Sequence, residues 1–210
     1  MALNLGEIRS RRDQMTQGIV SGLKDRSRYS LNRAVFTEKS AGKKSLFEHR
    51  LFEEGKQLAK AQTNAELPAD VRPLEIPSFI GRKTIEIYQC TLEELCQPGE
   101  RASEYEETAK LDAGNILLYK QRITWIGICV AEAKIQQTPA ILSLESYDEI
   151  RERMVVPEIE KKVIGAALAI AVQYGLDRLE PVERFFSDIM RLTVCVEILY
   201  VGHRKASAKP

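Results

Sequence analysis

The sequence predicts an all-α fold, a helical bundle with one long central helix. Apolar residues recur at helical spacing through most of the 210 residues. Prolines and glycines stand where helices are expected to begin and end. No two strand-like segments are joined by a hairpin turn signal, and no internal repeat is present. We therefore expect a single helical domain over residues 1–202 and a polar C-terminal tail over residues 203–210.

The first half of the chain divides into three predicted helices and a loop. The apolar face of the first helix consists of Ile8, Met15, Ile19 and Leu23. Ser45 followed by Glu48 matches a capping box, which opens a second helix toward Gln62. Three prolines predict a loop over residues 64–77. The third helix is expected over residues 85–95, where a Pro-Gly pair follows it.

The second half predicts four more helices. The longest runs from about residue 105 to residue 137 and is followed by a proline. Ser146, with Glu149 three residues later, matches a second capping box and is placed to cap a short helix. The next helix is expected over residues 157–174 and the last over residues 181–200. Each of these two helices has a proline in its first turn and a glycine just beyond its end.

Charge and hydropathy exclude several classes of protein. The net charge is +1, from 31 basic and 30 acidic residues. This balance argues against a general binder of nucleic acid or anionic membranes, while it allows a small anion in a cationic pocket. The first residues lack the charged head and apolar run of a signal peptide. The longest apolar stretch, residues 163–172, is about half the length of a membrane-spanning helix. We expect a cytoplasmic protein.

The cysteines and histidines argue against a metal site. The chain has four cysteines, which are Cys90, Cys96, Cys129 and Cys195. They form no CxxC pair, and only two histidines are available to assist them. Buried free thiols in a reducing compartment are the expected state.

Ionisable residues inside apolar helical stretches are the candidates for a functional site. The sequence has no glycine-rich phosphate loop, no GxSxG elbow and no HExxH motif. Lys134 follows an apolar stretch, and Glu197 lies within another. Thr193 stands four residues before Glu197 and therefore on the same helical face. Because an ionisable group on a buried face is unfavourable unless it is paired, these residues indicate a polar pocket.

Each charged candidate also has a purely structural interpretation. Arg9 and Arg122 are of a type that is usually solvated or salt-bridged on a helix. Lys134 can extend its amine to solvent at a helix edge. Glu160 suits the first turn of a helix, where the dipole favours a carboxylate. A buried Glu197 can pair with an arginine elsewhere in the chain, so the residues alone predict only a helical protein with a polar pocket.

The order of several motifs resembles that of the plant and fungal chorismate mutases, which are all-helical. The first motif is Tyr105-Glu-Glu-Thr-Ala-Lys-Leu-Asp112. An Arg-Ile pair begins at Arg122, ten residues after the aspartate, and Val-Ala-Glu-Ala-Lys134 follows. This block is similar to the central block of the family. Residues 3–9, Leu-Asn-Leu-Gly-Glu-Ile-Arg, resemble the family's opening helix.

Two later motifs extend the resemblance toward the C-terminus. Pro157-Glu-Ile-Glu160 is similar to the stretch that carries the family's substrate-binding glutamate, and Tyr174-Gly resembles the end of that helix. Thr193-Val-Cys-Val-Glu197 resembles its last functional pair. The resemblance covers most of the chain and is strongest between Tyr105 and Glu197.

The resemblance implies a chorismate mutase that rearranges chorismate to prephenate without a cofactor or a covalent intermediate, as a homodimer. It implies that Arg9 and Arg122 bind the two carboxylates of the substrate, because guanidinium groups match carboxylate geometry. Thr193 would orient one of these carboxylates.

The resemblance also implies roles for three residues at the reacting atoms. Lys134 and Glu197 would donate hydrogen bonds to the ether oxygen of the breaking bond. Because Glu197 donates only when it is protonated, its pKa is expected to be raised by burial and neighbouring carboxylates. Glu160 would accept a hydrogen bond from the ring hydroxyl.

One departure from the family concerns helical phase. Arg122 and Lys134 are twelve residues apart, one more than in the family, where the spacing is close to three helical turns. One extra residue rotates Arg122 by about 100° on an ideal helix. We expect a π-bulge between Thr124 and Gly127 to absorb this residue. In a regular helix, Ile123 is expected to take the place of the arginine.

Two further departures bear on specificity and regulation. Val156 replaces a polar residue near the substrate, which weakens binding or indicates a modified substrate. Glu106 and Glu107 replace the small turn of the family's effector site, so feedback by amino acids is expected to be absent. Two other functions stay open at this stage: action on another chorismate-derived acid, such as aminochorismate or isochorismate, and a non-catalytic helical binding protein.

Overall fold

A computed structural model describes residues 3–39, 44–61, 67–68 and 71–207. It confirms the all-α prediction, and the described residues form no β-strand. The helices are α1 (Leu5–Arg26), α2 (Ala34–Thr37), α3 (Leu46–Ala61), α4 (Ser78–Leu95), α5 (Tyr105–Gln137), α6 (Tyr147–Met154), α7 (Pro157–Gln173) and α8 (Glu180–Ala206). Within the described residues, none of these helices has both the length and the hydrophobicity needed to cross a membrane.

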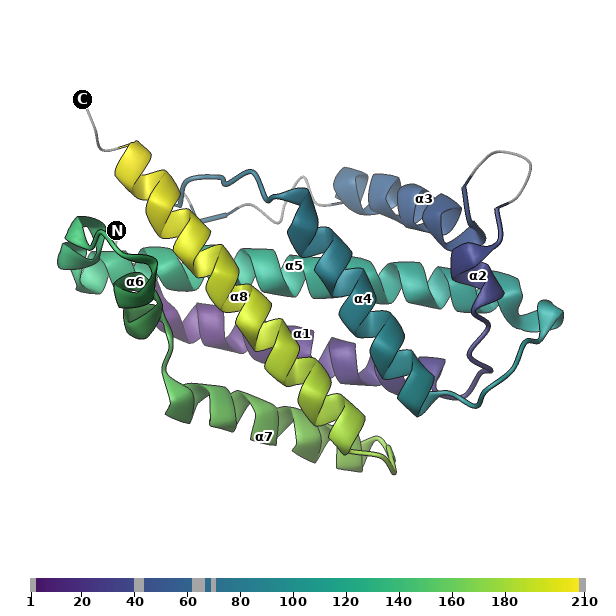
Figure 1. Ribbon diagram of the computed structural model, residues 1–210. Coiled ribbons are helices and arrows are strands. Elements are labelled where there is room, and N and C mark those ends of the chain that lie inside the picture. The colour runs from purple at the N-terminus through teal and green to yellow at the C-terminus, as the bar shows by residue number, and fades with distance from the viewer. Residues whose placement is uncertain (1–2, 40–43, 62–66, 69–70, 208–210) are drawn as a thin grey trace.

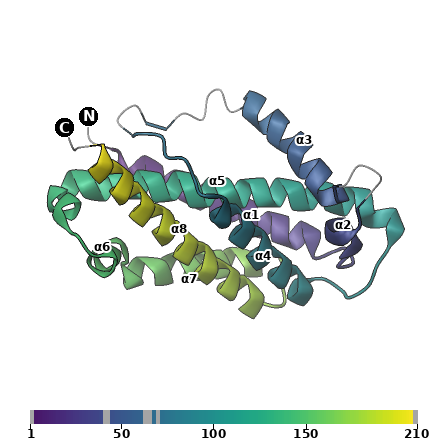
Figure 2. The ribbon, with the colours of Figure 1, turned by 45° about the horizontal axis from the view of Figure 1, so that its top comes forward.

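The long helix α5 organises the bundle (Figure 1). It packs against α1, α3, α4 and α8, while α7 packs against α1 and α8. Helices α4 and α8 cross α5 on one side, and the start of α1 and the end of α8 lie at the same end of the bundle as α6 (Figures 1 and 2). The predicted central helix is therefore confirmed, with the bounds expected from the sequence.

Capping chemistry explains where several helices begin. Asn4 caps α1, since its side-chain oxygen accepts a hydrogen bond from the backbone N–H of Gly6 at 3.0 Å. The two predicted capping boxes are present, at Ser45 with Glu48 and at Ser146 with Glu149. The first-turn prolines of α7 and α8 are also in the expected places.

Three sequence expectations need correction. Helix α4 begins at Ser78, before the predicted residue 85, because no residue after Pro77 breaks the helix. Helix α8 continues to Ala206 through Gly202, so the tail expected from residue 203 begins as helix, with basic residues suited to a C-terminal turn. All four cysteines are free, but Cys90 is exposed and Cys195 is partly exposed, so only the other two are the buried thiols expected.

A close approach of α5 and α8 sets the geometry at the centre of the molecule. A Cβ atom added to Gly127 would lie 2.9 Å from Cβ of Val196 and 3.0 Å from the carbonyl oxygen of Thr193. These distances leave no room for a side chain at residue 127. The glycine therefore lets the face of α8 that carries Thr193 and Glu197 pack directly on α5.

A buried ion pair ties α1 to α5 away from that contact. The Arg26 Nε atom donates to Asp112 Oδ1 at 2.7 Å, and both side chains are fully buried. The hydroxyl of Tyr88 on α4 donates to the same oxygen at 2.6 Å. Arg26 also donates to the carbonyls of Ser30 and Leu31, which fixes the chain after α1. The guanidinium is therefore compensated although no water reaches it.

We predict that Asp112→Asn destabilises the fold strongly, because it leaves Arg26 buried without a counter-charge. Burial raises the pKa of Asp112 to about 6, so at pH 8 the carboxylate is ionised. Loss of one partner of such a pair costs about 3 kcal/mol or more. Urea unfolding at pH 8 measures the loss. Glu93→Gln, which removes the exposed ion pair with Arg33, is the matched control and should leave the midpoint unchanged. Equal midpoints for the two variants would contradict the prediction.

Candidate active site

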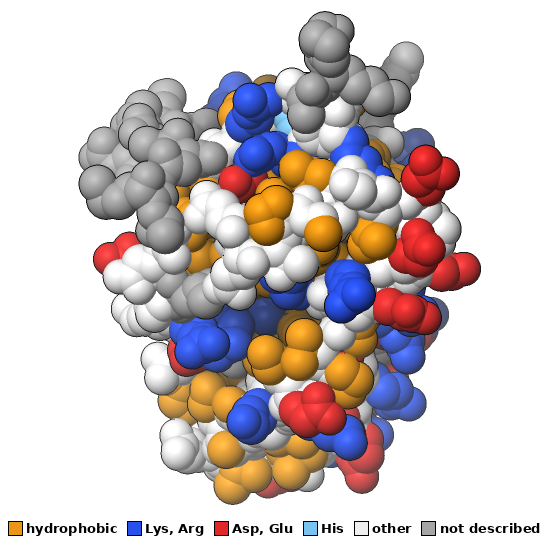
Figure 3. Space-filling model, turned by 90° about the vertical axis from the view of Figure 1, so that its left-hand side faces the viewer, with side chains coloured by type: hydrophobic (Ala, Val, Ile, Leu, Met, Phe, Trp, Pro, Cys, Tyr) orange, Lys and Arg blue, Asp and Glu red, His pale blue; other side chains and the backbone are white. Residues whose placement is uncertain are grey.

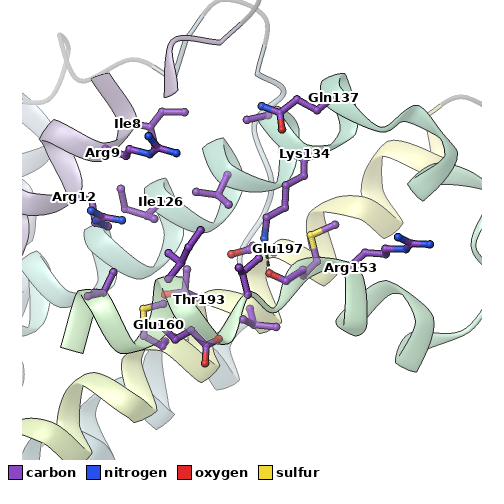
Figure 4. A pocket seen from close by; sticks show the side chains of 18 of the residues that line it. Ile8, Arg9, Arg12, Ile126, Lys134, Gln137, Arg153, Glu160, Thr193 and Glu197 are labelled. Atoms are coloured by element: carbon purple, nitrogen blue, oxygen red, sulfur yellow. Dashed lines mark hydrogen bonds and ion pairs between the residues drawn. The ribbon is translucent and has the colours of Figure 1, made fainter. Parts of the chain in front are cut away.

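A cavity of about 420 Å³ lies between α1, α5, α7 and α8, next to the end of α6. All six residues that the sequence singled out line it: Arg9, Arg122, Lys134, Glu160, Thr193 and Glu197. Figure 4 labels each of them except Arg122. Seen from the end of the bundle that carries α6, the surface is hollowed between hydrophobic and basic side chains (Figure 3). The structure therefore brings together residues from four helices that are distant in the sequence.

The contribution of α5 comes from a row of residues at i, i+4 spacing. The row consists of Arg122, Ile126, Val130 and Lys134, all of which line the cavity. Helix α5 is a regular α-helix throughout, so the predicted π-bulge between Thr124 and Gly127 is wrong. The expected consequence is wrong as well, since Ile123 lies fully buried in the core while Arg122 lines the cavity.

The inclination of this row explains how both ends reach one cavity. Each i+4 step advances about 40° around a helix and about 6 Å along it. The row therefore winds obliquely across α5 as a ridge, in the way that helix packing commonly uses. A cavity that follows the ridge is lined by Arg122 at one end and Lys134 at the other without any local distortion.

Lys134 and Glu197 form an ion pair across the cavity. The Lys134 Nζ atom lies 2.8 Å from Glu197 Oε2, and it also donates to the carbonyl of Met154 at the end of α6. Figure 4 shows the two side chains pointing toward one another from α5 and α8. Their positions are fixed by regular helices and by the Met154 carbonyl, so the amine and the carboxyl group are held ready to act on one ligand atom.

Burial governs the protonation of Glu197. Its side chain is 6% exposed, and this burial raises the pKa of the carboxyl group to about 7. The positive charge of Lys134 acts in the opposite direction, while the neighbouring Glu160 raises the pKa further. The raised pKa expected from the sequence is therefore present, with burial as its main cause. Near neutral pH, a large fraction of the molecules carries a protonated Glu197 that can donate a hydrogen bond.

Arg122 is a buried cation that faces the cavity. Its side chain is fully buried, and no described carboxylate lies within ion-pair distance of it. It makes only long contacts, to Thr193 Oγ1 at 3.4 Å and to Met190 Sδ at 3.6 Å, and its Nε atom has no described partner. Burial, followed by the positive charge of Arg12, lowers the pKa of Arg122 to about 10. Such a group is stabilised when an anion enters the cavity.

The other predicted residues stand nearer to solvent. Arg9 on α1 is exposed, and Glu160 in the first turn of α7 is half-buried. Neither makes an ion pair with a described residue. Both side chains are therefore available to a ligand in the cavity.

Sequence reasoning missed part of the lining. Arg12 lies three residues after Arg9 on the same face of α1, and this spacing is a signal that the sequence contains. Arg153 comes from α6 on the opposite side of the cavity (Figure 4) and has no comparable signal. The apolar part of the lining includes Ile126, Val130, Ile141, Val156, Ile159, Val163 and Val194. With five cations and two carboxylates, the cavity suits an anion with an apolar body.

Solved structures with the same fold include fungal and plant chorismate mutases. The chorismate mutase Aro7p from Candida albicans, in complex with L-Trp, matches with a TM-score of 0.77 at 20% identity over 98% of this chain and 93% of that chain. AtCM1, with tyrosine bound in an allosteric site, matches with a TM-score of 0.77 at 25% identity over 96% of each chain. The chloroplast chorismate mutase from Zea mays matches with a TM-score of 0.72 at 22% identity over 96% of each chain.

Comparison of sequences gives no further relative: no model of a protein family matches the chain, and neither does any curated protein. The match in structure nevertheless runs through nearly the whole length of both chains. The chain therefore has the fold of these chorismate mutases.

We predict that the Glu197 carboxyl group titrates near pH 7. The measurement is the ¹³C chemical shift of the labelled carboxyl carbon against pH, with Glu197→Gln to assign the signal. Because the folded pKa is raised above the unfolded value of about 4.3, the contribution of this group to stability is full below pH 4 and is lost as the pH rises through 7. Lys134→Met removes the charge that lowers the pKa, so the midpoint should move higher still. A midpoint near pH 4 would contradict the role of burial.

Proposed function

We propose that this protein is a chorismate mutase, which converts chorismate to prephenate by an intramolecular rearrangement. The observation that carries the proposal is the pairing of two features in one apolar cavity. Arg122 is a buried cation with no counter-charge among the described residues, and Lys134 and Glu197 form a donor pair across from it. The shared fold with fungal and plant chorismate mutases supports the same conclusion.

Chorismate needs little covalent chemistry from a protein. It is a dianion, and its rearrangement breaks one ether bond and forms one carbon–carbon bond within the same molecule. The protein must hold the reactive conformation and stabilise the charge that develops on the ether oxygen. In the proposal, Arg122 and Arg9 each bind one carboxylate, and Thr193, which contacts Arg122, orients the carboxylate beside it.

Lys134 and Glu197 act on the ether oxygen in this proposal. The Lys134 amine donates one hydrogen bond, and Glu197 donates a second when it is protonated, which its raised pKa allows at neutral pH. Glu160 accepts a hydrogen bond from the ring hydroxyl at the opposite wall. An acceleration of about a million-fold requires roughly 8 kcal/mol, which several preorganised contacts in a cavity with an apolar lining can supply.

The apolar wall supports a substrate with a hydrocarbon ring. Val156, which replaces a polar residue of the family, lines the cavity with Ile159 and Val163 and extends this wall. No observation on the described residues favours another chorismate-derived acid or a non-catalytic binding protein over chorismate mutase activity.

The proposal extends to assembly, regulation and location. It includes a homodimer in the cytoplasm, as the resemblance and the sequence imply. It also includes the absence of feedback by amino acids. In support of the latter, the exposed carboxylate of Glu106 forms an ion pair with Arg50 of α3 and stands beside Glu107, where the family has a small turn. Arg50 offsets the charge of Glu106, and the carboxylate of Glu107 disfavours the carboxylate of an amino-acid effector at this position.

We predict that the purified protein consumes chorismate and forms prephenate, and that Lys134→Ala abolishes most of this activity. Loss of one donor to the developing charge lowers kcat by about a hundredfold to a thousandfold. The loss of chorismate absorbance gives the rate, and chromatography identifies the product. Lys110→Ala, which removes an exposed lysine from the same helix, is the matched control and should keep wild-type activity. Inactive wild-type protein would overturn the proposed function.

We predict that kcat falls as the pH rises through about 7, because Glu197 loses the proton that it donates. Glu197→Gln carries an amide donor at every pH. The variant should therefore show a flat profile over the same range, measured with saturating chorismate between pH 5 and 9. The same fall in Glu197→Gln as in the wild type would exclude Glu197 as the titrating group.

A further inference from the structure

The first turns of α1 place a second arginine in the cavity. Arg12 lies three residues after Arg9, and the guanidinium groups of both lie along the cavity side of α1 (Figure 4). The Arg12 side chain is only 23% exposed, so it forms part of the wall and is not a free surface cation. Arg11, the neighbouring residue, points elsewhere and stacks over Trp125 at 4.3 Å from the ring centre.

The hydrogen bonds of Arg12 leave one edge of its guanidinium open. Its Nε and Nη2 atoms both donate to the same oxygen of Asp13, at 2.9 and 2.7 Å. Asp13 is 61% exposed and does not line the cavity. The remaining nitrogen, Nη1, donates to no described residue. Asp13 thus fixes the outer edge of the guanidinium and leaves the other edge available to a ligand.

Arg12 and Arg122 also act on one another. Both line the cavity, and the charge of Arg12 contributes to the lowered pKa of Arg122. Two like charges that share a partly dry cavity repel one another until an anion lies near both. The one described carboxylate whose charge acts on the pKa of Arg122 is Asp13, which is the ion-pair partner of Arg12 and faces solvent.

We propose that Arg12 is a specificity-determining residue that shares with Arg122 one carboxylate of a dicarboxylate substrate. This inference rests on the proposed function and adds a third arginine to the two that the motifs indicated. The carboxylates of chorismate take no part in the bonds that break and form. A contact to a carboxylate is therefore equally strong in the substrate and in the transition state, and it acts on KM far more than on kcat.

The test compares Arg12→Gln with Arg11→Gln, the same substitution at the neighbouring residue outside the cavity. Loss of a charge-assisted hydrogen bond at a partly exposed site corresponds to about tenfold in binding. We expect Arg12→Gln to raise KM for chorismate about tenfold while kcat stays within about threefold of wild type. The dissociation constant of prephenate, also a dicarboxylate and measured by titration calorimetry, should rise by a similar factor. Arg11→Gln should leave both constants unchanged.

The outcomes separate this inference from the proposed function. Wild-type protein that neither turns over chorismate nor binds prephenate overturns both. Active wild-type protein together with a wild-type KM and prephenate affinity in Arg12→Gln overturns the role of Arg12 alone, as does a fall confined to kcat. Should Arg12→Gln lose its helical circular dichroism, Arg12→Lys serves instead. The lysine keeps the positive charge but lacks the planar set of N–H donors of the guanidinium, so it should raise KM by about threefold. An unchanged KM in Arg12→Lys overturns the inference.

Discussion

The close contact between α5 and α8 is the constraint on which the site depends. Any side chain at residue 127 would overlap Val196 and the Thr193 carbonyl, so the two helices approach as closely as their backbones allow. Two polar pairs join α5 and α8 on either side of this contact. One pair is Arg122 with Thr193, and the other is Lys134 with Glu197. A short separation at this point keeps the facing side chains of α5 and α8 close on both sides of it.

The same burial that stabilises the bundle leaves the functional groups in unfavourable states. It shifts the pKa of Arg122 downward and that of Glu197 upward, in each case toward the neutral form. The ion pair of Arg26 and Asp112 shows how the fold treats a buried arginine that has only a structural role, since each nitrogen of the Arg26 guanidinium has a partner within the protein. Among the described residues, Arg122 has only its long contacts to Thr193 and Met190. The contrast between two equally buried arginines is what marks the cavity as a place for an anion.

The sequence predicted most of the fold because local signals decide where helices begin. The capping boxes at Ser45 and Ser146 and the first-turn prolines of α7 and α8 are local, and they appear as expected. Boundaries without such a local signal, whether beginnings or ends, are less predictable. Nothing after Pro77 stops α4 from starting early, and a glycine within a helix that packs well, such as Gly202, does not end it. These ends depend on tertiary packing, which a local pattern does not contain.

The six candidate residues came from the order of family motifs, and the structure places all of them on one cavity. The prediction of a π-bulge was wrong because it assumed that residues of α5 can face the ligand only when they project from the helix axis at the same angle. In three dimensions, the ridge from Arg122 to Lys134 is oblique, and long side chains at its two ends reach the same space. The same reasoning accounts for Arg12. On α1, the step of three residues from Arg9 to Arg12 stays on the face that borders this oblique cavity. The same cavity therefore holds both arginines of α1 and both ends of the row on α5.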